Sequence, residues 1–192
     1  MTHLFLYGTL RHDPLRAVVG GGTVPKPVQA RLTGHAVAKE PKFHLPFLVR
    51  RDGGVIDGLL LQDVGGEAMA RFDAYEGDYR REAIEVLTEQ GPVWAEAYFP
   101  PDHFVEHPEP WSFEAWRAAE GAMTVLAAEE VFAHDPPPAG GVLNGQWPMI
   151  LMRAHVQLRA AGGAAPARLR YAPCDGDVTW RRRAPLSGDF FK

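Results

Sequence analysis

The stretch Phe72-Asp-Ala-Tyr-Glu-Gly-Asp-Tyr-Arg-Arg81 lies where a helical pattern gives way to a strand. Met69, Phe72 and Tyr75 recur at helical spacing, which predicts a short amphipathic helix over 66–75. Gly77 predicts a sharp exit from that helix, because glycine tolerates the backbone angles that end helices. Glu76 therefore stands at a corner between helix and strand. It is either a solvated helix-end residue or a candidate acid or base.

A second corner follows the first apolar run of the chain, Leu4-Phe-Leu-Tyr-Gly-Thr-Leu-Arg11. This pattern predicts a short strand over 3–7 that stops at Gly8. Glycine lets another group approach the backbone closely, and the turn that follows presents backbone N–H groups. An anion-accepting loop and a carboxylate at the other corner would together form an acid/base site. The alternative is an ordinary strand exit.

Length and composition limit the class of protein. The chain has 192 residues, a formal net charge of −4 and one cysteine, Cys174. Its length suits one medium domain, or one domain with a fragment of another. The acidic balance argues against nucleic acid as a partner, and a single cysteine excludes an intrachain disulfide and fits a reducing compartment. The N-terminus lacks a basic leader, and no apolar run approaches the roughly 20 residues that span a bilayer. We expect a soluble, cytoplasmic protein without a membrane partner, and its oligomeric state stays open.

The first hundred residues contain several short strand patterns with two short helices between them. A helix is expected from Asp13 to Val19, ending at the glycine triplet 20–22. Strands are expected over 28–38 with a kink at Gly34, over 55–61, over 82–87 and over 93–99. The segment 43–49 contains Pro46, which indicates an edge strand or an irregular segment. Within the apolar run 55–61, Gly58 indicates a bulge or a close backbone approach. This pattern indicates an α+β sheet or small barrel rather than a βαβ repeat.

The second half of the chain is organised differently. Ser112 is expected to cap a helix that runs to about Phe132. We expect a first domain over 1–134, a linker over 135–147 rich in proline and glycine, and an extension over 148–192 with a short β-hairpin near Asp175. The extension either packs on the first domain or begins a second one.

Three motifs resemble known sites without meeting their requirements. His103-Phe-Val-Glu-His107 matches a zinc-binding pattern, but prolines on both sides disfavour the helix that the pattern needs. The glycines at 140–145 lack the lysine of a phosphate-binding loop. Cys174 has no neighbouring histidine, which indicates a structural residue rather than a nucleophile. We therefore expect no metal ion and no cofactor.

Four motifs in register resemble the gamma-glutamylcyclotransferase (AIG2-like) family across residues 3–100. They are the Tyr-Gly-Thr-Leu segment at 7–10, Val55-x-x-Gly-x-Leu60, the Asp-x-Tyr-Glu-Gly core at 73–77, and Tyr79-x-Arg81. The resemblance implies a small mixed β-barrel flanked by short helices, to which the helix expected after Ser112 would be added. It also implies one small-molecule site, with Glu76 as the catalytic residue. The substrate-binding residues would then be Tyr7, Gly8, Thr9, Leu10 and Tyr79.

The activity implied by the resemblance is an intramolecular cyclisation. The α-amine of a γ-glutamyl amine or peptide attacks its own γ-carbonyl, giving 5-oxoproline and releasing the amine half. Residues 148–192 show a fainter resemblance to the leading segment of Nudix-type ADP-ribose pyrophosphatases, without the Nudix box. The alternative function is therefore a non-catalytic ligand-binding or regulatory module attached to such a hydrolase.

Overall fold

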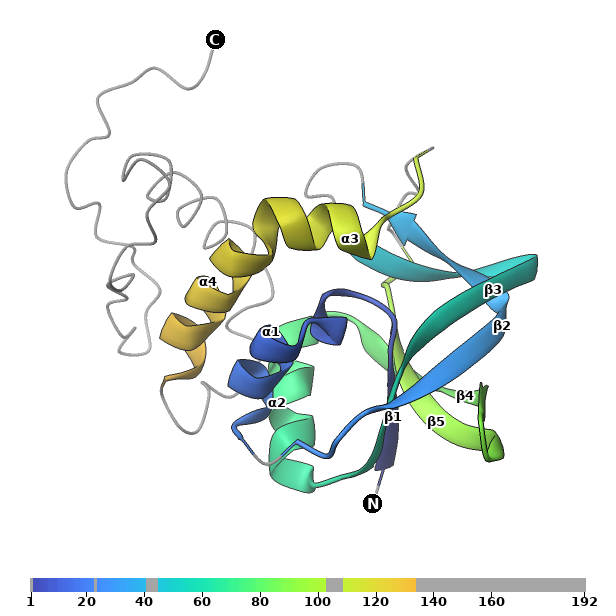
Figure 1. The fold of residues 1–192 in the computed structure, drawn as a ribbon, viewed down its shortest axis with the longest axis horizontal. Helices are drawn as coiled ribbons and strands as arrows, with labels where there is room; N and C mark the ends of the chain where they lie inside the picture. The colour runs from blue at the N-terminus through green and yellow to red at the C-terminus, as the bar shows by residue number, and fades with distance from the viewer. Residues whose placement is uncertain (1, 23, 41–44, 103–108, 134–192) are drawn as a thin grey trace, which may run out of the picture.

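A computed structural model describes residues 2–22, 24–40, 45–102 and 109–133 of the chain (Figure 1). The strands are β1 (Thr2–Leu6), β2 (Val28–Lys39), β3 (Pro46–Val64), β4 (Arg80–Thr88) and β5 (Gly91–Phe99). The helices are α1 (Asp13–Gly20), α2 (Gly66–Glu76), α3 (Phe113–Trp116) and α4 (Ala122–Phe132), with a 3-10 turn η1 at Thr9–Arg11 and a π-helical segment at Arg117–Gly121. The α+β class predicted from the sequence is confirmed.

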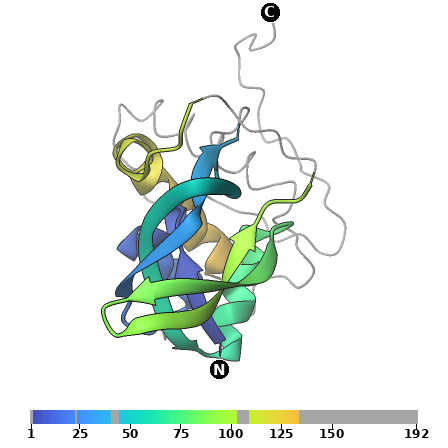
Figure 2. The same cartoon turned by 90° about the vertical axis from the view of Figure 1, so that its right-hand side faces the viewer.

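The strands form a ring in the order β1-β3-β2-β4-β5, and β5 returns to β1 (Figure 2). Neighbouring strands are antiparallel except β1 and β5, which pair in parallel at Leu4 and Glu96. The β2–β3 and β4–β5 ladders are long, whereas β2 meets β4 only at Ala30 and Arg31. The predicted small mixed barrel is therefore confirmed. It consists of the β2–β3 and β4–β5 hairpins, which are joined on one side by the few β2–β4 pairs and on the other side through β1.

The long β2–β3 hairpin bends at Gly34. The register shifts between Thr33 and His35, and Gly34 has a φ of 71°, a conformation that residues with a side chain rarely adopt. Residues 51–54 of β3 thus lie opposite Gly34 alone, and such an interruption of the ladder lets the strands bend. The kink predicted at Gly34 is confirmed, and it helps a two-stranded ladder to curve around the ring.

Pro46 is the first residue of β3, and the expected edge strand is confirmed for the described part of the segment 43–49, because residues 46–49 pair with β2 on one side and β1 pairs only with residues 59–64 of β3. Residues 46–49 pair with Lys39 to Ala36 of β2, and the strand continues without interruption to Val64. A proline is tolerated at the first residue of a strand, where its missing N–H costs no ladder hydrogen bond. The strand expected over 55–61 is thus the middle of a longer element. Within it Leu60 and Leu61 are fully buried, but Val55 is 57% exposed.

Gly58 lies where β1 crosses β3. A Cβ atom at this position would lie 2.6 Å from the carbonyl oxygen of Leu6 and 2.5 Å from the Cζ of Phe5. Gly58 pairs in register with Ala30, so the close backbone approach predicted for it is confirmed and the alternative of a bulge is not. The glycine allows β1 to lie against β3 and so to carry the Tyr7–Gly8 corner.

Replacing Gly58 by alanine is expected to lower the free energy of unfolding by about 1–3 kcal/mol, because the added methyl group forces β1 away from β3. Urea denaturation of the full chain measures this loss. Gly66→Ala is the matched control, since no described atom lies within 4 Å of a Cβ placed there and its φ is negative. Equal stability of the two variants would contradict the close approach.

Two apolar clusters meet along β1, whose side chains alternate between them. One cluster fills the ring with side chains from all five strands, including Phe5, Leu32, Leu48, Leu60, Ile84 and Phe99. The other joins the outer side of β1 to α1, α2 and α4, which lie together on one side of the ring (Figure 1). Its members include Leu4, Leu6, Leu15, Phe72, Trp116 and Phe132.

The predicted C-terminal helix is present, but it is not one regular α-helix. Ser112 caps it as expected, with its Oγ accepting a hydrogen bond from the Ala115 N–H at 3.2 Å. The π-helical segment then separates α3 from α4. Within the predicted range, Trp116, Met123 and Val131 are buried, whereas Phe113 and Leu126 are partly exposed.

Several predictions concern residues outside the described part of the chain. They are the loop with the zinc-like pattern at 103–107, the linker over 135–147 and the extension over 148–192 with its β-hairpin. The proposed domain boundaries and the resemblance to Nudix hydrolases therefore stay predictions. Among the described helices, none has the length and apolar character needed to cross a membrane.

Candidate active site

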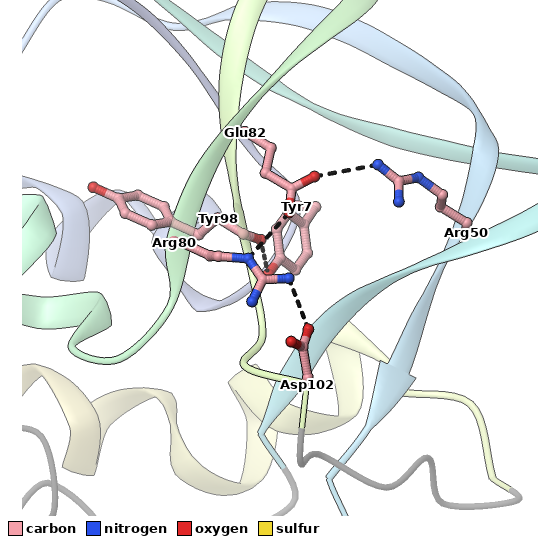
Figure 3. Close-up of polar contacts among 6 residues, drawn as sticks. All are labelled: Tyr7, Arg50, Arg80, Glu82, Tyr98 and Asp102. Carbon is pink, nitrogen blue, oxygen red and sulfur yellow. Dashed lines mark hydrogen bonds and ion pairs between the residues drawn. The ribbon is translucent and has the colours of Figure 1, made fainter.

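The glycine corner, residues Tyr7 to Leu10, connects β1 to η1. The Tyr7 ring is buried, and its hydroxyl donates a hydrogen bond to the Tyr98 carbonyl oxygen at 2.8 Å (Figure 3). A Cβ atom on Gly8 would lie 2.9 Å from the Cγ of Pro46. Glycine at position 8 therefore lets the start of β3 pack directly on the corner.

The turn after Gly8 carries backbone donors, and its Thr9 hydroxyl meets α2. The first hydrogen bond of the turn runs from the Arg11 N–H to the Gly8 carbonyl at 3.1 Å. The N–H groups of Thr9 and Leu10 come before this bond, so the turn itself does not use them. The Thr9 hydroxyl and the Tyr75 hydroxyl are 2.9 Å apart. The Leu10 side chain belongs to the core and is 2% exposed. Leu10 can therefore contact a ligand only through its backbone.

Arg16, which the sequence analysis did not single out, holds this turn in place. It is 6% exposed, and its Nη1 donates to the carbonyl oxygens of Leu10 at 3.0 Å and Arg11 at 3.2 Å. Its Nη2 also contacts the Asp13 carboxylate. A buried guanidinium that donates to two successive carbonyls fixes the turn, because each bond to a charged donor is stronger than a neutral one.

The acidic corner is the C-terminal end of α2. The helix ends at Glu76, and Gly77 follows with a φ of 65°. The Gly77 N–H donates to the Asp73 carbonyl at 3.0 Å, and the Tyr79 N–H donates to the Glu76 carbonyl at 3.3 Å. These two bonds satisfy the last carbonyls of the helix and turn the chain into β4. Glu76 itself is only partly buried, so it retains contact with solvent.

The surroundings of Glu76 raise the pKa of its carboxyl from the ordinary 4.5 to about 8. Burial is the larger cause, because desolvation disfavours the charged form, and the nearby Asp73 charge adds to it. A carboxyl with a pKa near 8 exchanges its proton close to neutral pH. That property suits a group that must first accept a proton and then return it.

Four tyrosines surround Glu76, and they come from different elements. Burial raises the pKa of every one of these hydroxyls, and the Glu76 charge raises it further: Tyr7, Tyr75, Tyr79 and Tyr98. The Tyr79 hydroxyl also donates to the Pro46 carbonyl at 3.3 Å. The structure therefore brings the acidic corner and the glycine corner together: Thr9 contacts Tyr75, next to Glu76, and Tyr7 and Tyr79 lie within the influence of the Glu76 charge.

A row of charged side chains borders this cluster on β3, β4 and the end of β5. Glu82 accepts from Arg50 at 3.2 Å and from Arg80 at 3.3 Å, and Arg80 also donates to Asp102 at 2.9 Å (Figure 3). Glu82 follows the inward-facing alternation of Ile84 and Val86 on β4. Each of these charges has a partner of opposite sign. Exposed ion pairs of this kind contribute little to the free energy of folding.

The sequence analysis missed three residues at the acidic corner, namely Asp73, Arg81 and Tyr98. The Tyr98 hydroxyl donates to an Asp73 carboxylate oxygen at 2.7 Å, and the Arg81 Nε lies 2.9 Å from the same oxygen. Asp73 and Arg81 stand in the stretch that opened the sequence analysis. Asp73 and Arg81 are eight residues apart on either side of a glycine turn, and this spacing is the sequence signal that could have indicated their contact.

Among the described residues, no group of three or more His, Cys, Asp or Glu side chains is arranged to hold a metal ion.

The raised pKa of Glu76 predicts a stability that falls with increasing pH. The folded carboxyl, with a pKa of about 8, keeps its proton between pH 4.5 and 8, whereas the unfolded carboxyl has released it. Wild type therefore loses stability across this window, and Glu76→Gln should not. We expect the two proteins to unfold alike at pH 4 and the variant to be more stable by about 2–4 kcal/mol at pH 9. This difference is smaller than the full linkage energy, because Glu76 retains contact with solvent.

Urea denaturation at pH 4, 6, 8 and 9 measures this effect. Glu85→Gln is the matched control, because Glu85 is an exposed carboxylate on β4. A stability difference between Glu76→Gln and wild type that is the same at every pH would show that burial does not raise the Glu76 pKa.

A comparison with known families identifies the chain. Residues 4–118 match the family described as gamma-glutamyl cyclotransferase, AIG2-like. The chain belongs to this family. The match covers β1 through the start of the π-helical segment, and so includes both corners and the whole ring. The resemblance inferred from the four motifs is confirmed.

The chain is also similar to two individual proteins. Protein AIG2 C of Arabidopsis thaliana is 27% identical over 146 residues, which cover 72% of this chain and 86% of that protein. The solution structure of another Arabidopsis thaliana protein is 26% identical, with a TM-score of 0.50. That similarity covers 65% of this chain and 77% of the other. The extension lies outside the segment matched to the AIG2-like family.

Proposed function

We propose that this AIG2-like protein is a gamma-glutamylcyclotransferase-type enzyme. It would convert a γ-glutamyl amine or peptide to 5-oxoproline and release the amine half. The observation that carries the proposal is that Glu76, a carboxyl of pKa about 8, directly follows Tyr75, whose hydroxyl lies 2.9 Å from the Thr9 hydroxyl in the glycine corner. Membership of the AIG2-like family supports the same reaction.

The proposed reaction needs one group that moves a proton, and Glu76 is that group. As a carboxylate it takes a proton from the attacking α-amine while the new C–N bond to the γ-carbonyl carbon forms. The resulting tetrahedral intermediate collapses, the bond to the leaving nitrogen breaks, and Glu76 returns the proton to that nitrogen. One carboxyl thus serves both steps, which is why a pKa near the working pH helps the reaction.

The glycine corner would bind the reacting part of the substrate. N–H groups of Gly8, Thr9 and Leu10 would hold the γ-carbonyl oxygen as it gains negative charge, or the α-carboxylate of the glutamyl group. The hydroxyls of Tyr7 and Tyr79 would line the same side and limit the water around Glu76. This part of the proposal is supported by the Thr9–Tyr75 contact of 2.9 Å, which ties the corner to the helix that carries Glu76.

Incubation of the full chain with a panel of γ-glutamyl amino acids and γ-glutamyl amines tests the proposal. We expect 5-oxoproline and the free amine to appear in equal amounts with at least one member of the panel. Saturable binding of panel members without any turnover would contradict the enzyme and favour the ligand-binding alternative. A cytoplasmic location is part of the proposal and would be tested by fractionation of cells that produce the protein.

A further inference from the structure

An ion pair spans the corner that carries Glu76. Asp73 lies one helical turn before Glu76 on α2, and Arg81 lies near the start of β4. The Arg81 Nε is 2.9 Å from one Asp73 oxygen, and its Nη2 is 3.4 Å from the other. The two residues stand on opposite sides of the Gly77 turn. Their contact therefore fixes the angle between α2 and β4 at which Glu76 projects.

The same ion pair is joined to the glycine corner through Tyr98. The Tyr98 hydroxyl donates to Asp73 at 2.7 Å, and its backbone carbonyl accepts the hydrogen bond from Tyr7 at 2.8 Å. Arg81 also contacts the Glu96 carboxylate on β5. The pair therefore links α2, β4, β5 and the end of β1. A change at Asp73 or Arg81 would be transmitted to the residues that face Glu76.

We propose, on the basis of the reaction assigned to Glu76 above, that Asp73 and Arg81 are positioning residues for it. They hold the Glu76 corner in place. They also put the negative charge of Asp73, partly neutralised by Arg81, one helical turn from the Glu76 carboxyl. Neither residue needs to touch the substrate. Their effect on the reaction comes through the orientation and the charge state of Glu76.

The electrostatic part of this effect has a definite sign. Residues three apart on a helix lie on the same face, so the Asp73 charge acts on Glu76 and helps to raise its pKa. Arg81 carries the opposite charge and weakens that effect. The other groups that face Glu76 are the hydroxyls of Tyr7, Tyr75, Tyr79 and Tyr98, which stay neutral at the pH of interest because burial raises their pKa. Glu40, beyond Tyr79, acts on that hydroxyl.

The test compares Asp73→Asn with Arg81→Gln. The Glu76 carboxyl is followed by NMR in protein labelled with ¹³C at the glutamate side-chain carboxyl, and the signal is assigned from its loss in Glu76→Gln. We expect Asp73→Asn to lower the titration midpoint of Glu76 and Arg81→Gln to raise it, each by roughly 0.5–1 pH unit. Opposite shifts are the decisive result, because a purely structural role gives no reason for the two midpoints to move in different directions.

Two further variants control the comparison. Arg81→Lys keeps the positive charge, so its midpoint should remain close to that of wild type. Arg31→Gln removes an exposed ion pair with Asp57 on β2 and β3 and should leave the midpoint unchanged. Midpoints that stay fixed in both Asp73→Asn and Arg81→Gln, or that move in the same direction, would overturn the proposal.

The titration needs no substrate, so it separates this proposal from the proposed function. Opposite shifts in a protein without turnover would keep the positioning roles and overturn the enzyme. Turnover with fixed midpoints would keep the enzyme and overturn the positioning roles. Where both hold, the pH profile of kcat/KM should move with the Glu76 midpoint in each variant.

Discussion

Glu76→Gln is expected to lower kcat for the cyclisation by roughly 10²–10⁴-fold, the usual contribution of a general acid or base. Glutamine has nearly the same shape as a protonated glutamate, so the corner between α2 and β4 should keep its structure. It can neither take the proton from the attacking amine nor return it to the leaving nitrogen. The measurement is the rate of 5-oxoproline formation with the best member of the substrate panel, and KM should change little.

The control for this result is Glu85→Gln, which removes an exposed carboxylate of β4 and should retain wild-type activity. Circular dichroism and urea denaturation show whether the Glu76 variant remains folded. A folded Glu76→Gln protein with activity within tenfold of wild type would remove Glu76 from the proposed role.

Arg71→Met is expected to lower the free energy of unfolding by about 3–5 kcal/mol. Arg71 lies on α2 and is 5% exposed. Its guanidinium donates to the carbonyls of Val19 at 2.7 Å, Val18 at 3.1 Å and Phe132 at 3.2 Å. These carbonyls lie in the last turns of α1 and α4, where helix carbonyls generally lack an internal partner, although that of Val18 also accepts from the Gly21 N–H at 3.4 Å. Methionine fills a similar volume but leaves them without these donors, and each unsatisfied buried carbonyl costs free energy.

Urea denaturation of three variants distinguishes this account from loss of charge alone. Arg71→Lys keeps the charge, but an ammonium group cannot reach carbonyls of two helices as a planar guanidinium does, so a large part of the loss should remain. Arg31→Met removes an exposed arginine and should change stability by less than about 1 kcal/mol. An Arg71→Met protein as stable as Arg31→Met would contradict the role of Arg71 in joining the helices.

Features of the fold that depend on a strict local requirement were predictable from the sequence. Gly34 and Gly58 indicated a kink and a close approach, because a side chain at either place is strained or crowded. Ser112 indicated a helix start for the same kind of reason, since its hydroxyl accepts from a backbone N–H. Pro46 indicated an edge strand, and residues 46–49 do pair with β2 on one side, with the proline tolerated as the first residue of β3. It gave no sign that this strand continues to Val64.

The candidate site was predictable only in part. Glu76 and the Tyr7–Gly8 corner could be singled out, because an acid after a helix and a glycine after a strand are visible along the chain. The partners of Asp73 could not be found in this way. Arg81 and Tyr98 are opposite each other across the β4–β5 ladder, and their contact with α2 depends on how the ring packs against the helices. Local sequence patterns carry no information about such long-range packing.

The position of β1 in the ring bears on how the protein is made on the ribosome. β1 precedes the other four strands of the ring along the chain, yet its two neighbours are β3 and β5, whose residues are synthesised later. At roughly 5–20 residues per second, the nascent chain exposes an incompletely paired β1 for several seconds. The hydrogen bond from Tyr7 to Tyr98 forms only after β5 is complete. A chain released after Glu76 but before Tyr98 would therefore lack this hydrogen bond between the glycine corner and β5.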